Sequence, residues 1–480
     1  MPPIRLDAAA LLDGRAVTPR LSVRTTALTT DQADRLGLVA TAVTEGSSEA
    51  AATSSPAAPD ALLRLAAGQT QVTSWVRYGR GMVGLGRALE LHARGTERIE
   101  ALRAAWRQVV YASWWSDPLV RPGTGPVALG TITFAASSRQ DSVLLVPRVL
   151  IGVDDDGAWL TTAVAEGDAH PRPAEVIEEL HAAAAGQETT AAQPGSAVVS
   201  PGSHDRSTYL GCLSRVQERM RAGEVDKVVI ARDLLVRPRQ TLGAPELLAR
   251  LARSYPSCWT FAVDGMVGAS PELLVRLSGR RLASRVLAGT ARRRAGAPGE
   301  REREAARLAA WLEGSDKNNR EHALARSSAL QALEPLCSVV QAPPRHVLTL
   351  PNVLHLASDI TGVVAGDTGA LSLVGALHPT AAVGGTPTPQ AVDVIETEEP
   401  MDRGRYAGPV GWVDWHGEGE WCIALRSGQM SAAAAGPEDP VRVFGGGGIM
   451  PDSDPLDELA ETEAKMRPML RALDAPATSR

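Results

Sequence analysis

The stretch Phe444-Gly-Gly-Gly-Gly-Ile-Met450, which leads into Asp454-Pro-Leu-Asp-Glu-Leu-Ala-Glu-Thr-Glu-Ala-Lys465, joins an apolar segment to an acidic one. Four glycines are typical of a turn, because glycine adopts conformations that other residues avoid, and such a turn can present N–H groups to an anion. Asp454 and Pro455 suit the cap and first position of a helix. Pro468 is expected to kink or end that helix. We therefore predict a strand, an anion-binding glycine turn and an acidic helix.

The acidic helix carries a patterned face. Glu458, Glu461 and Lys465 are spaced by three and four residues, so they share one side of the helix. In isolation this pattern is typical of a solvent-exposed face with an ordinary ion pair. The neighbouring glycines favour a second interpretation, in which carboxylates bind a divalent cation, and Glu321 in Asn318-Asn-Arg-Glu-His322 can supply another carboxylate. Because no His- or Cys-rich spacing occurs, an oxygen-bound ion such as magnesium is favoured.

Composition limits the class of protein. The chain has 480 residues, of which 44% are hydrophobic and 22% charged, and a net charge of −6. These values are typical of a globular protein with one large or two to three ordinary domains. An acidic balance without basic runs argues against nucleic-acid or anionic-membrane partners. We recognise no signal segment or membrane span, and four widely spaced cysteines fit a reducing cytoplasm better than a zinc site. We expect a cytoplasmic protein without an obligatory protein partner.

The chain has one clear internal boundary. Residues 182–204 are low in complexity, and we predict a mobile linker there. This linker separates residues 1–195, which are expected to complete the sheets, from a catalytic core of residues 196–480 in one intertwined domain. A loop is expected at 43–60, and blocks of helices and strands favour an α+β fold. Helices are expected at 206–222 and, capped by Ser315 or Asp316, within 299–334, and strands at 127–134, 142–147, 227–232, 259–264, 266–277, 282–288, 409–415, 420–427 and 440–444.

Several polar side chains interrupt the predicted strands. Lys227 opens one strand, and Glu272 lies within Gly268-Ala-Ser-Pro-Glu-Leu-Leu274. Arg426 ends an apolar strand and suits a clamp for a carboxylate, while Tyr406 offers a hydroxyl group. Lys227, Glu272 and Tyr406 also have plainer interpretations, as an exposed lysine, a turn residue after proline and a half-buried aromatic. No single one of these residues decides the function.

Together these segments resemble the chorismate-binding enzymes, a family that includes anthranilate synthase component I, aminodeoxychorismate synthase, salicylate synthase and isochorismate synthase. The resemblance covers about residues 205–470. It implies an α+β fold in which two largely antiparallel sheets pack together, with helices outside and the active site between them. The matching segments are Lys227-Val-Val-Ile-Ala-Arg232, Gly268-Ala-Ser-Pro-Glu272, Leu287-Ala-Gly-Thr-Ala-Arg292, Asn319-Arg-Glu-His322, Leu377-His-Pro-Thr-Ala-Ala-Val-Gly-Gly-Thr-Pro387 and the block from Tyr406 to Lys465.

Three positions resemble the isochorismate synthases within this family. Lys227 matches a lysine that anthranilate and aminodeoxychorismate synthases lack. Ala288 stands where one type of aminodeoxychorismate synthase carries a nucleophilic lysine, and His378-Pro-Thr-Ala-Ala-Val-Gly384 is similar to the isochorismate subgroup. The resemblance therefore implies magnesium-dependent conversion of chorismate to isochorismate. Salicylate synthase and a non-catalytic chorismate-binding protein are the alternatives, and the pathway, menaquinone or siderophore synthesis, stays open.

The same resemblance implies a role for each site residue. Lys227 is the expected general base for a water that attacks ring carbon 2, and Glu272 is the expected general acid for the hydroxyl that leaves carbon 4. A lysine acts as a base only when it is neutral, so its surroundings must favour that form. The expected Mg²⁺ ligands are Glu321, Glu461 and Glu458. The residues expected to bind chorismate are Gly289, Thr290, His355, Tyr406, Arg426, Gly446, Gly448 and Lys465.

Overall fold

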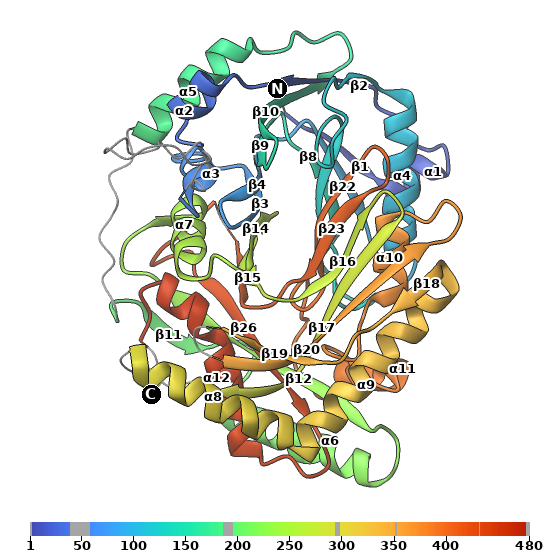
Figure 1. Ribbon diagram of the computed structural model, residues 1–480, viewed down its shortest axis with the longest axis vertical. Helices are drawn as coiled ribbons and strands as arrows, with labels where there is room; N and C mark the ends of the chain where they lie inside the picture. Colours follow the sequence, from blue (N-terminus) through green and yellow to red (C-terminus); the bar gives the residue numbers. More distant parts are fainter. Residues whose placement is uncertain are drawn as a thin grey trace, which may run out of the picture.

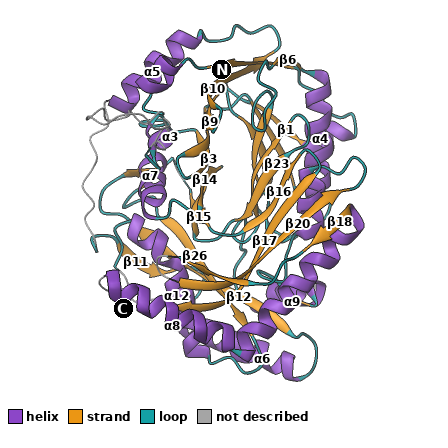
Figure 2. Cartoon of the chain, viewed as in Figure 1, coloured by secondary structure: helices purple, strands orange, loops and turns teal. Residues whose placement is uncertain are grey.

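A computed structural model describes residues 2–38, 58–185, 195–292, 298–350, 353–431 and 433–476. Two large sheets face each other along the length of the molecule, and helices lie around them (Figure 1). Figure 2 shows the same arrangement by type of element, with strands inside and helices outside. The predicted α+β fold of two packed sheets is confirmed.

Sheet A, as we name the first of the two, has 11 strands in the described part of the chain, and sheet B has 13. In spatial order, sheet A contains β1 (Ile4–Asp7), β5 (Leu89–Ala93), β8 (Ser142–Val146), β7 (Val127–Thr131), β22 (Pro409–Asp414), β23 (Gly419–Ile423), β16 (Leu273–Ser278), β17 (Arg281–Arg292), β20 (Val353–Val364) and β18 (Cys337–Gln341), with β19 (His346–Thr349) also paired to β20. Sheet B contains β11 (Val198–Pro201), β12 (Lys227–Arg237), β26 (Val441–Ile449), β24 (Ser427–Met430), β15 (Met266–Ser270), β14 (Trp259–Val263), β3 (Val72–Arg77), β4 (Arg80–Leu85), β9 (Val149–Asp154), β10 (Gly157–Ala165), β2 (Leu21–Ala27) and β6 (Trp114–Ser116), with β21 (Gly385–Thr386) also paired to β12. A short ribbon pairs β13 (Leu242–Gly243) with β25 (Ala434–Ala435).

The strand pairing is largely antiparallel, with parallel pairs where β1 meets β5 and β2 meets β6. Strands from the first 195 residues enter both sheets, because β7 pairs with β22 in sheet A and β3 pairs with β14 in sheet B. The predicted mobile linker at 182–204 is partly wrong. Its first residues belong to a helix that ends at Ala185, and β11 pairs with β12, while residues 186–194 lie outside the described part. Most of the loop expected at 43–60 also lies outside it.

The helices begin where the local sequence satisfies their free N–H groups. Ser315 caps α9 by accepting a hydrogen bond from the Asn318 backbone N–H, and Asp454 caps α12 in the same way through Leu456 and Asp457. Both caps were predicted, but Pro468 lies inside α12 and does not end it. The helices are α1 (Ala8–Leu12), α2 (Thr30–Arg35), α3 (Ala61–Arg64), α4 (Arg98–Ala112), α5 (Pro173–Ala185), α6 (Arg206–Arg221), α7 (Ala244–Ser254), α8 (Pro298–Gly314), α9 (Asp316–Leu333), α10 (Ala370–Leu377), α11 (Thr388–Glu398) and α12 (Pro455–Ala472), with a 3₁₀ turn at Glu334–Leu336.

Two predicted strands are in fact pairs of strands that change sheets. The segment 266–277 runs as β15 in sheet B, crosses at Pro271-Glu272, and continues as β16 in sheet A. The segment 420–427 runs as β23 in sheet A and, after Ala424-Leu425-Arg426, becomes β24 in sheet B. Both segments are apolar along most of their length, so the sequence pattern predicts one continuous strand for each. The crossings place their polar residues between the sheets.

The predicted glycine turn is also wrong, because Gly445–Gly448 form part of β26 and pair with β12. Side chains have no room on either face of this strand. A Cβ on Gly445 would lie 2.7 Å from the backbone oxygen of Thr462 on α12, and a Cβ on Gly448 would lie 2.4 Å from Glu321 Oε1. The glycines therefore let a helix approach one face of β26 and polar side chains approach the other.

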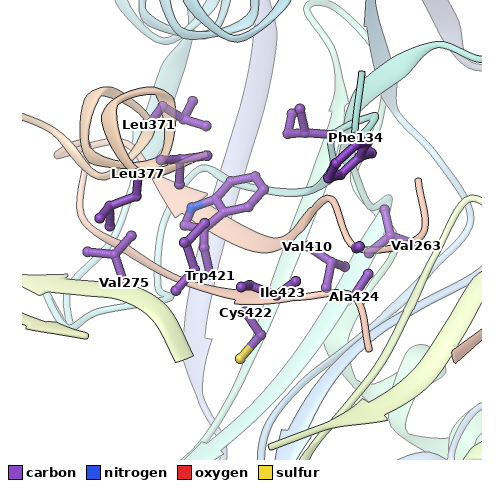
Figure 3. Close-up of a cluster of buried hydrophobic side chains, with 14 of the residues drawn as sticks. Phe134, Val263, Val275, Leu371, Leu377, Val410, Trp421, Cys422, Ile423 and Ala424 are labelled. Atoms are coloured by element: carbon purple, nitrogen blue, oxygen red, sulfur yellow. The ribbon is translucent and has the colours of Figure 1, made fainter. Parts of the chain in front are cut away.

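Buried apolar side chains hold the sheets and helices together. In the cluster of Figure 3, Trp421 of β23 is fully buried beside Leu371 and Leu377 of α10, and Val263 of sheet B lies beyond Val410 of sheet A. Burial of a large aromatic side chain of this kind contributes about 2–3 kcal/mol. No helix within the described residues is long and apolar enough to cross a bilayer.

Candidate active site

A cavity opens where the two sheets come together, near the ends of β12, β17 and β26. Its walls come from both crossings, from the glycines of β26, from α9 and from α12. The cavity is lined by ten of the thirteen predicted site residues, namely Glu272, Gly289, Thr290, Glu321, His355, Tyr406, Arg426, Gly446, Gly448 and Lys465. Lys227 adjoins this wall through Glu321, whereas Glu458 and Glu461 do not line the cavity.

Glu272 stands at the crossing from β15 to β16. The crossing is held by hydrogen bonds: the Glu272 N–H donates to Ser270 Oγ at 3.3 Å, and the Ile423 N–H donates to the Glu272 carbonyl at 3.1 Å. The side chain is 4% exposed. Burial raises the pKa of Glu272 to about 8, against an ordinary value of 4.5, because a carboxylate loses its hydration there. The group is therefore protonated at neutral pH and can donate a proton.

Arg426 occupies the second crossing, where its backbone adopts a positive φ of 51°. Its Nη2 donates a hydrogen bond to His355 Nε2 at 3.0 Å, and His355 Nδ1 lies 3.1 Å from Thr290 Oγ1. A guanidinium only donates, so His355 must carry its proton on Nδ1 and donate to Thr290. Burial lowers the pKa of His355 well below its usual range, which keeps the ring neutral. The Thr290 hydroxyl hydrogen is then free to reach an acceptor in the cavity.

Lys227 begins β12 and is completely buried. Its Nζ lies 3.1 Å from Glu321 Oε1 on α9 but makes no hydrogen bond of good geometry. The Lys227 side chain also passes Gly448, because a Cβ there would lie 3.1 Å from Lys227 Cε. Its charge acts on the Glu272 carboxyl as well. The predicted base and acid therefore belong to one electrostatic environment, although one begins a strand of sheet B and the other lies at the crossing between the sheets.

Lys465 and Tyr406 both approach Gly446 in the glycine strand. Lys465 Nζ donates to the Gly446 carbonyl at 2.9 Å and pairs with Glu461 at 2.7 Å. Tyr406 is 5% exposed, and its ring stacks on Phe444 at a centroid distance of 4.8 Å. Burial raises the pKa of Tyr406, so its hydroxyl remains a neutral donor. Together with Arg426, these side chains give the cavity a wall that is suited to a carboxylate.

The charges of the three predicted metal ligands all act on one lysine. Lys317 Nζ pairs with Glu458 at 2.7 Å, and although burial lowers the pKa of Lys317, the charges of Glu458, Glu321 and Glu461 outweigh burial and raise it. Ser453 donates a further hydrogen bond to Glu458 at 2.7 Å. Burial and the neighbouring Glu461 raise the pKa of Glu458.

These carboxylates suit Mg²⁺ in their chemistry, because they are hard oxygen donors that already act together on one cation. In the conformation described, each pairs with a lysine, and no three His, Cys, Asp or Glu side chains of the described residues are close enough to hold a metal. Their role as ligands stays a prediction.

Sequence reasoning missed two charged residues of this region, Lys317 and Arg403, the second of which lines the cavity. One signal for Lys317 is present in the composition. The chain has only three lysines against 46 arginines, and all three, Lys227, Lys317 and Lys465, pair with the predicted site glutamates. A protein that uses arginine almost everywhere else has lysine only here.

The raised pKa of Glu272 makes stability depend on pH. A carboxyl group that titrates at about 8 when folded and near 4.5 when unfolded holds its proton more tightly in the folded state. The free energy of unfolding should therefore fall as pH rises from 4.5 to 8, by about 1.4 kcal/mol per pH unit at most. Glu272→Gln should remove this slope, so that its stability relative to wild type increases across the window. Denaturant unfolding at pH 5 and pH 8 measures the free energy of unfolding of Glu272→Gln relative to wild type. The same relative value at both pH values would contradict the raised pKa of Glu272.

Fold and site together define a class of enzyme: one that holds a small carboxylated substrate between two sheets and presents a buried proton donor beside a lysine. The family described as chorismate binding enzyme matches residues 53–474, and the chain therefore belongs to it. The chain is 30% identical to isochorismate synthase MenF of Bacillus subtilis over 412 residues, which cover 82% of this chain and 85% of that protein. It is 32% identical to isochorismate synthase EntC of Escherichia coli over 366 residues, which cover 75% and 84%.

A solved structure shows the same fold. The structure of MenF, the menaquinone-specific isochorismate synthase from Escherichia coli, superimposes with a TM-score of 0.69. The match covers 97% of this chain and 98% of that chain at 23% sequence identity.

Proposed function

We propose that this chain converts chorismate to isochorismate. In this reaction water adds at ring carbon 2, the ring double bonds shift, and the carbon 4 hydroxyl leaves. The observation that carries the proposal is a buried, protonated Glu272 in a cavity that also holds Arg426 and Lys465 and adjoins Lys227. The family membership and the relatives named isochorismate synthase support the same reaction.

Two proton transfers balance the reaction. Lys227, in its neutral form, takes a proton from the attacking water as the bond from oxygen to carbon 2 forms. Glu272 gives its proton to the departing hydroxyl as the bond at carbon 4 breaks, so one water enters and one leaves. Each transfer contributes about 10²–10⁴-fold to the rate. The pKa of about 8 at Glu272 suits this role, because the acid is protonated at neutral pH.

The remaining side chains position the substrate. Arg426, Tyr406, Lys465 and the backbone of Gly446 and Gly448 form the cationic and hydrogen-bonding wall, and we assign to them the enolpyruvyl carboxylate. Gly289 and Thr290 lie at a β-bulge of β17, where Gly289 has a positive φ of 81°, and His355 aims the Thr290 hydroxyl by the hydrogen bond described above. Holding the substrate in a fixed orientation against this wall lowers the entropic cost of the reaction.

We also propose that Glu321, Glu458 and Glu461 hold Mg²⁺. When bound, the ion would neutralise the carboxylate on the ring and act as a Lewis acid. The support is the convergence of three carboxylate charges on Lys317. Lysine pairing in the absence of the ion satisfies the same carboxylates, so the ion and the lysines compete for them.

Glu461→Ala should raise the Mg²⁺ concentration needed for half-maximal activity by about 10- to 100-fold, because a ligand is lost. Calorimetric titration of Mg²⁺ into the free protein should show the same weakening without any substrate. The matched control is Glu463→Ala on the same helix, whose carboxylate faces Arg232 at 3.9 Å. Equal Mg²⁺ affinity in wild type and Glu461→Ala would remove Glu461 from the ligand set.

The decisive assay uses purified protein with chorismate and Mg²⁺, with products separated by chromatography. Isochorismate without pyruvate supports the proposal. Stoichiometric pyruvate with fluorescent salicylate would establish a salicylate synthase instead, and saturable chorismate binding without turnover would establish a non-catalytic binder. We propose that this single chain is sufficient and that it acts in the cytoplasm, where its four cysteines, all free in the described structure, would stay reduced.

A further inference from the structure

The strand that carries Lys227 has an unusual second edge. One edge of β12 pairs with β26 from Val228 to Val236. The other edge pairs with β21 only at Lys227 and Val228, and with β11 only from Leu234 onward. The Val229 N–H still donates to the Gly384 carbonyl, just before β21, at 2.8 Å, but from the Val229 carbonyl to Ala231 no strand of the described part of the chain pairs with this edge.

A buried ion pair fills this gap. Glu399 Oε1 accepts a hydrogen bond from the Ala231 N–H at 2.7 Å, and Arg403 Nη2 donates to the Val229 carbonyl at 2.6 Å. Glu399 and Arg403 pair with each other through both carboxylate oxygens, including a contact of 2.8 Å from Arg403 Nε to Glu399 Oε2. Their side chains are 1% and 3% exposed. The pair thus takes the place of a neighbouring strand where β21 ends, two residues after Lys227.

Arg403 also joins three walls of the cavity. Its Nη1 donates to the Val383 carbonyl at 3.0 Å, its Nη2 holds Val229, and its own carbonyl accepts from the Tyr406 N–H at 3.0 Å. Val229, Val383 and Tyr406 all line the cavity. One arginine therefore connects three segments: its guanidinium holds the strand with the lysine and the loop before α11, and its backbone carbonyl holds the turn with the tyrosine.

Stability alone does not account for this arrangement. Burying two charges costs hydration that their attraction only partly returns, so a buried ion pair is often no more stabilising than apolar packing. Its specific property is geometry, because a planar guanidinium with fixed donors defines the directions of its acceptors. That property suits a part of the fold where a small displacement matters.

We propose that Glu399 and Arg403 form a positioning pair that fixes β12, and with it the Lys227 ammonium, relative to the substrate cavity. The inference rests on the proposed function, since it concerns the base of that reaction. Neither residue transfers a proton. Their effect passes through the backbone of Val229 and Ala231 to Lys227.

The test compares two neighbouring arginines. Arg403→Lys keeps the charge but cannot serve the carboxylate and two carbonyls together. Arg405→Lys is the matched control: Arg405 is buried in the same turn, and its guanidinium donates to the Asp264 carboxylate and carbonyl and the Asp141 carbonyl, which belong neither to β12 nor to the cavity lining. Both variants should lose similar thermal stability.

Of the two arginine variants, only Arg403→Lys should change the rate of the chemical step. Its kcat should fall about 10- to 100-fold, the scale of a displacement of about 1 Å, with KM for chorismate little changed. Its solvent deuterium isotope effect on kcat should rise, because transfer to a displaced lysine becomes more rate-limiting. Arg405→Lys should match wild type in kcat and in the isotope effect, with activity corrected for the folded fraction by circular dichroism.

A second variant tests the pair independently, in case Arg403→Lys does not fold. Glu399→Gln keeps an acceptor for the Ala231 N–H and should show a smaller fall in kcat in the same direction. The inference is overturned if Arg403→Lys retains wild-type kcat and isotope effect, if both arginine variants lose kcat equally, or if neither Arg403→Lys nor Glu399→Gln folds, since the pair would then be structural. An inactive wild type would instead refute the proposed function.

Discussion

Replacing Lys227 by arginine or by alanine is expected to abolish isochorismate synthesis, with kcat reduced by about 10²–10⁴-fold in a folded protein. Arginine is the more informative change. It can still pair with Glu321, but a guanidinium stays protonated at any working pH and cannot accept a proton from water. The reaction would lose its base while a cationic partner for Glu321 remains.

Arginine and alanine at position 227 test different properties of the side chain. Arginine outnumbers lysine 46 to three in this chain, so the protein folds with arginine at nearly every other cationic position. Lys227 is fully buried and lies 3.1 Å from Glu321, and the larger arginine must fit the same space. Alanine is smaller than lysine, so a loss of activity in Lys227→Ala cannot be caused by crowding in this space. The measurement is steady-state turnover of chorismate, with calorimetric binding of chorismate to show that the site persists.

Small primary amines added to Lys227→Ala should restore part of the rate, because they can enter the space left by the side chain and accept the proton. Arginine at this position blocks that space, so amines should not rescue Lys227→Arg. Near wild-type kcat in Lys227→Arg would show that position 227 supplies charge and not a base.

Glu272→Gln should also lower kcat by about 10²–10⁴-fold, because glutamine has the same shape but no proton to give to the leaving hydroxyl. The pH dependence of the rate should also distinguish wild type from Glu272→Gln. In wild type the donor is protonated below a pKa of about 8, so the rate should fall as pH rises through 8. The residual rate of Glu272→Gln should lack this fall.

The control for this change is Glu420→Gln on the neighbouring strand β23. Glu420 accepts hydrogen bonds from Trp75 and Arg276 at 2.7 Å and does not line the cavity. It should lose some stability and keep its activity and pH profile. Retention of near-full rate by Glu272→Gln would assign the proton donor to another group.

Much of the secondary structure follows from local sequence. The helices α6, α9 and α12 begin close to the predicted positions, because a capping side chain and the periodicity of apolar residues act within one or two turns. The errors share one cause. Strands 266–277 and 420–427 are apolar throughout most of their length, and nothing local says that each leaves one sheet for the other at Glu272 and Arg426.

The glycine run shows the same limit. Four glycines predict a turn from their backbone freedom, but in β26 they serve to leave space on both faces. The reason lies in distant segments, α12 on one face and Glu321 of α9 on the other. A pattern that depends on what approaches from elsewhere cannot be read from the run itself.

By itself the sequence determined the chemical groups and their order along the chain: a lysine at the start of a strand, a glutamate after a proline, and carboxylates at helical spacing. Only the tertiary structure decided that Glu272 is buried deeply enough to hold its proton, that each lysine meets one of three glutamates, and that Glu399 and Arg403 complete the edge of β12. The physical reason is that hydration and charge pairing depend on which remote segments close over a residue, whereas local periodicity records only which side of an element is apolar.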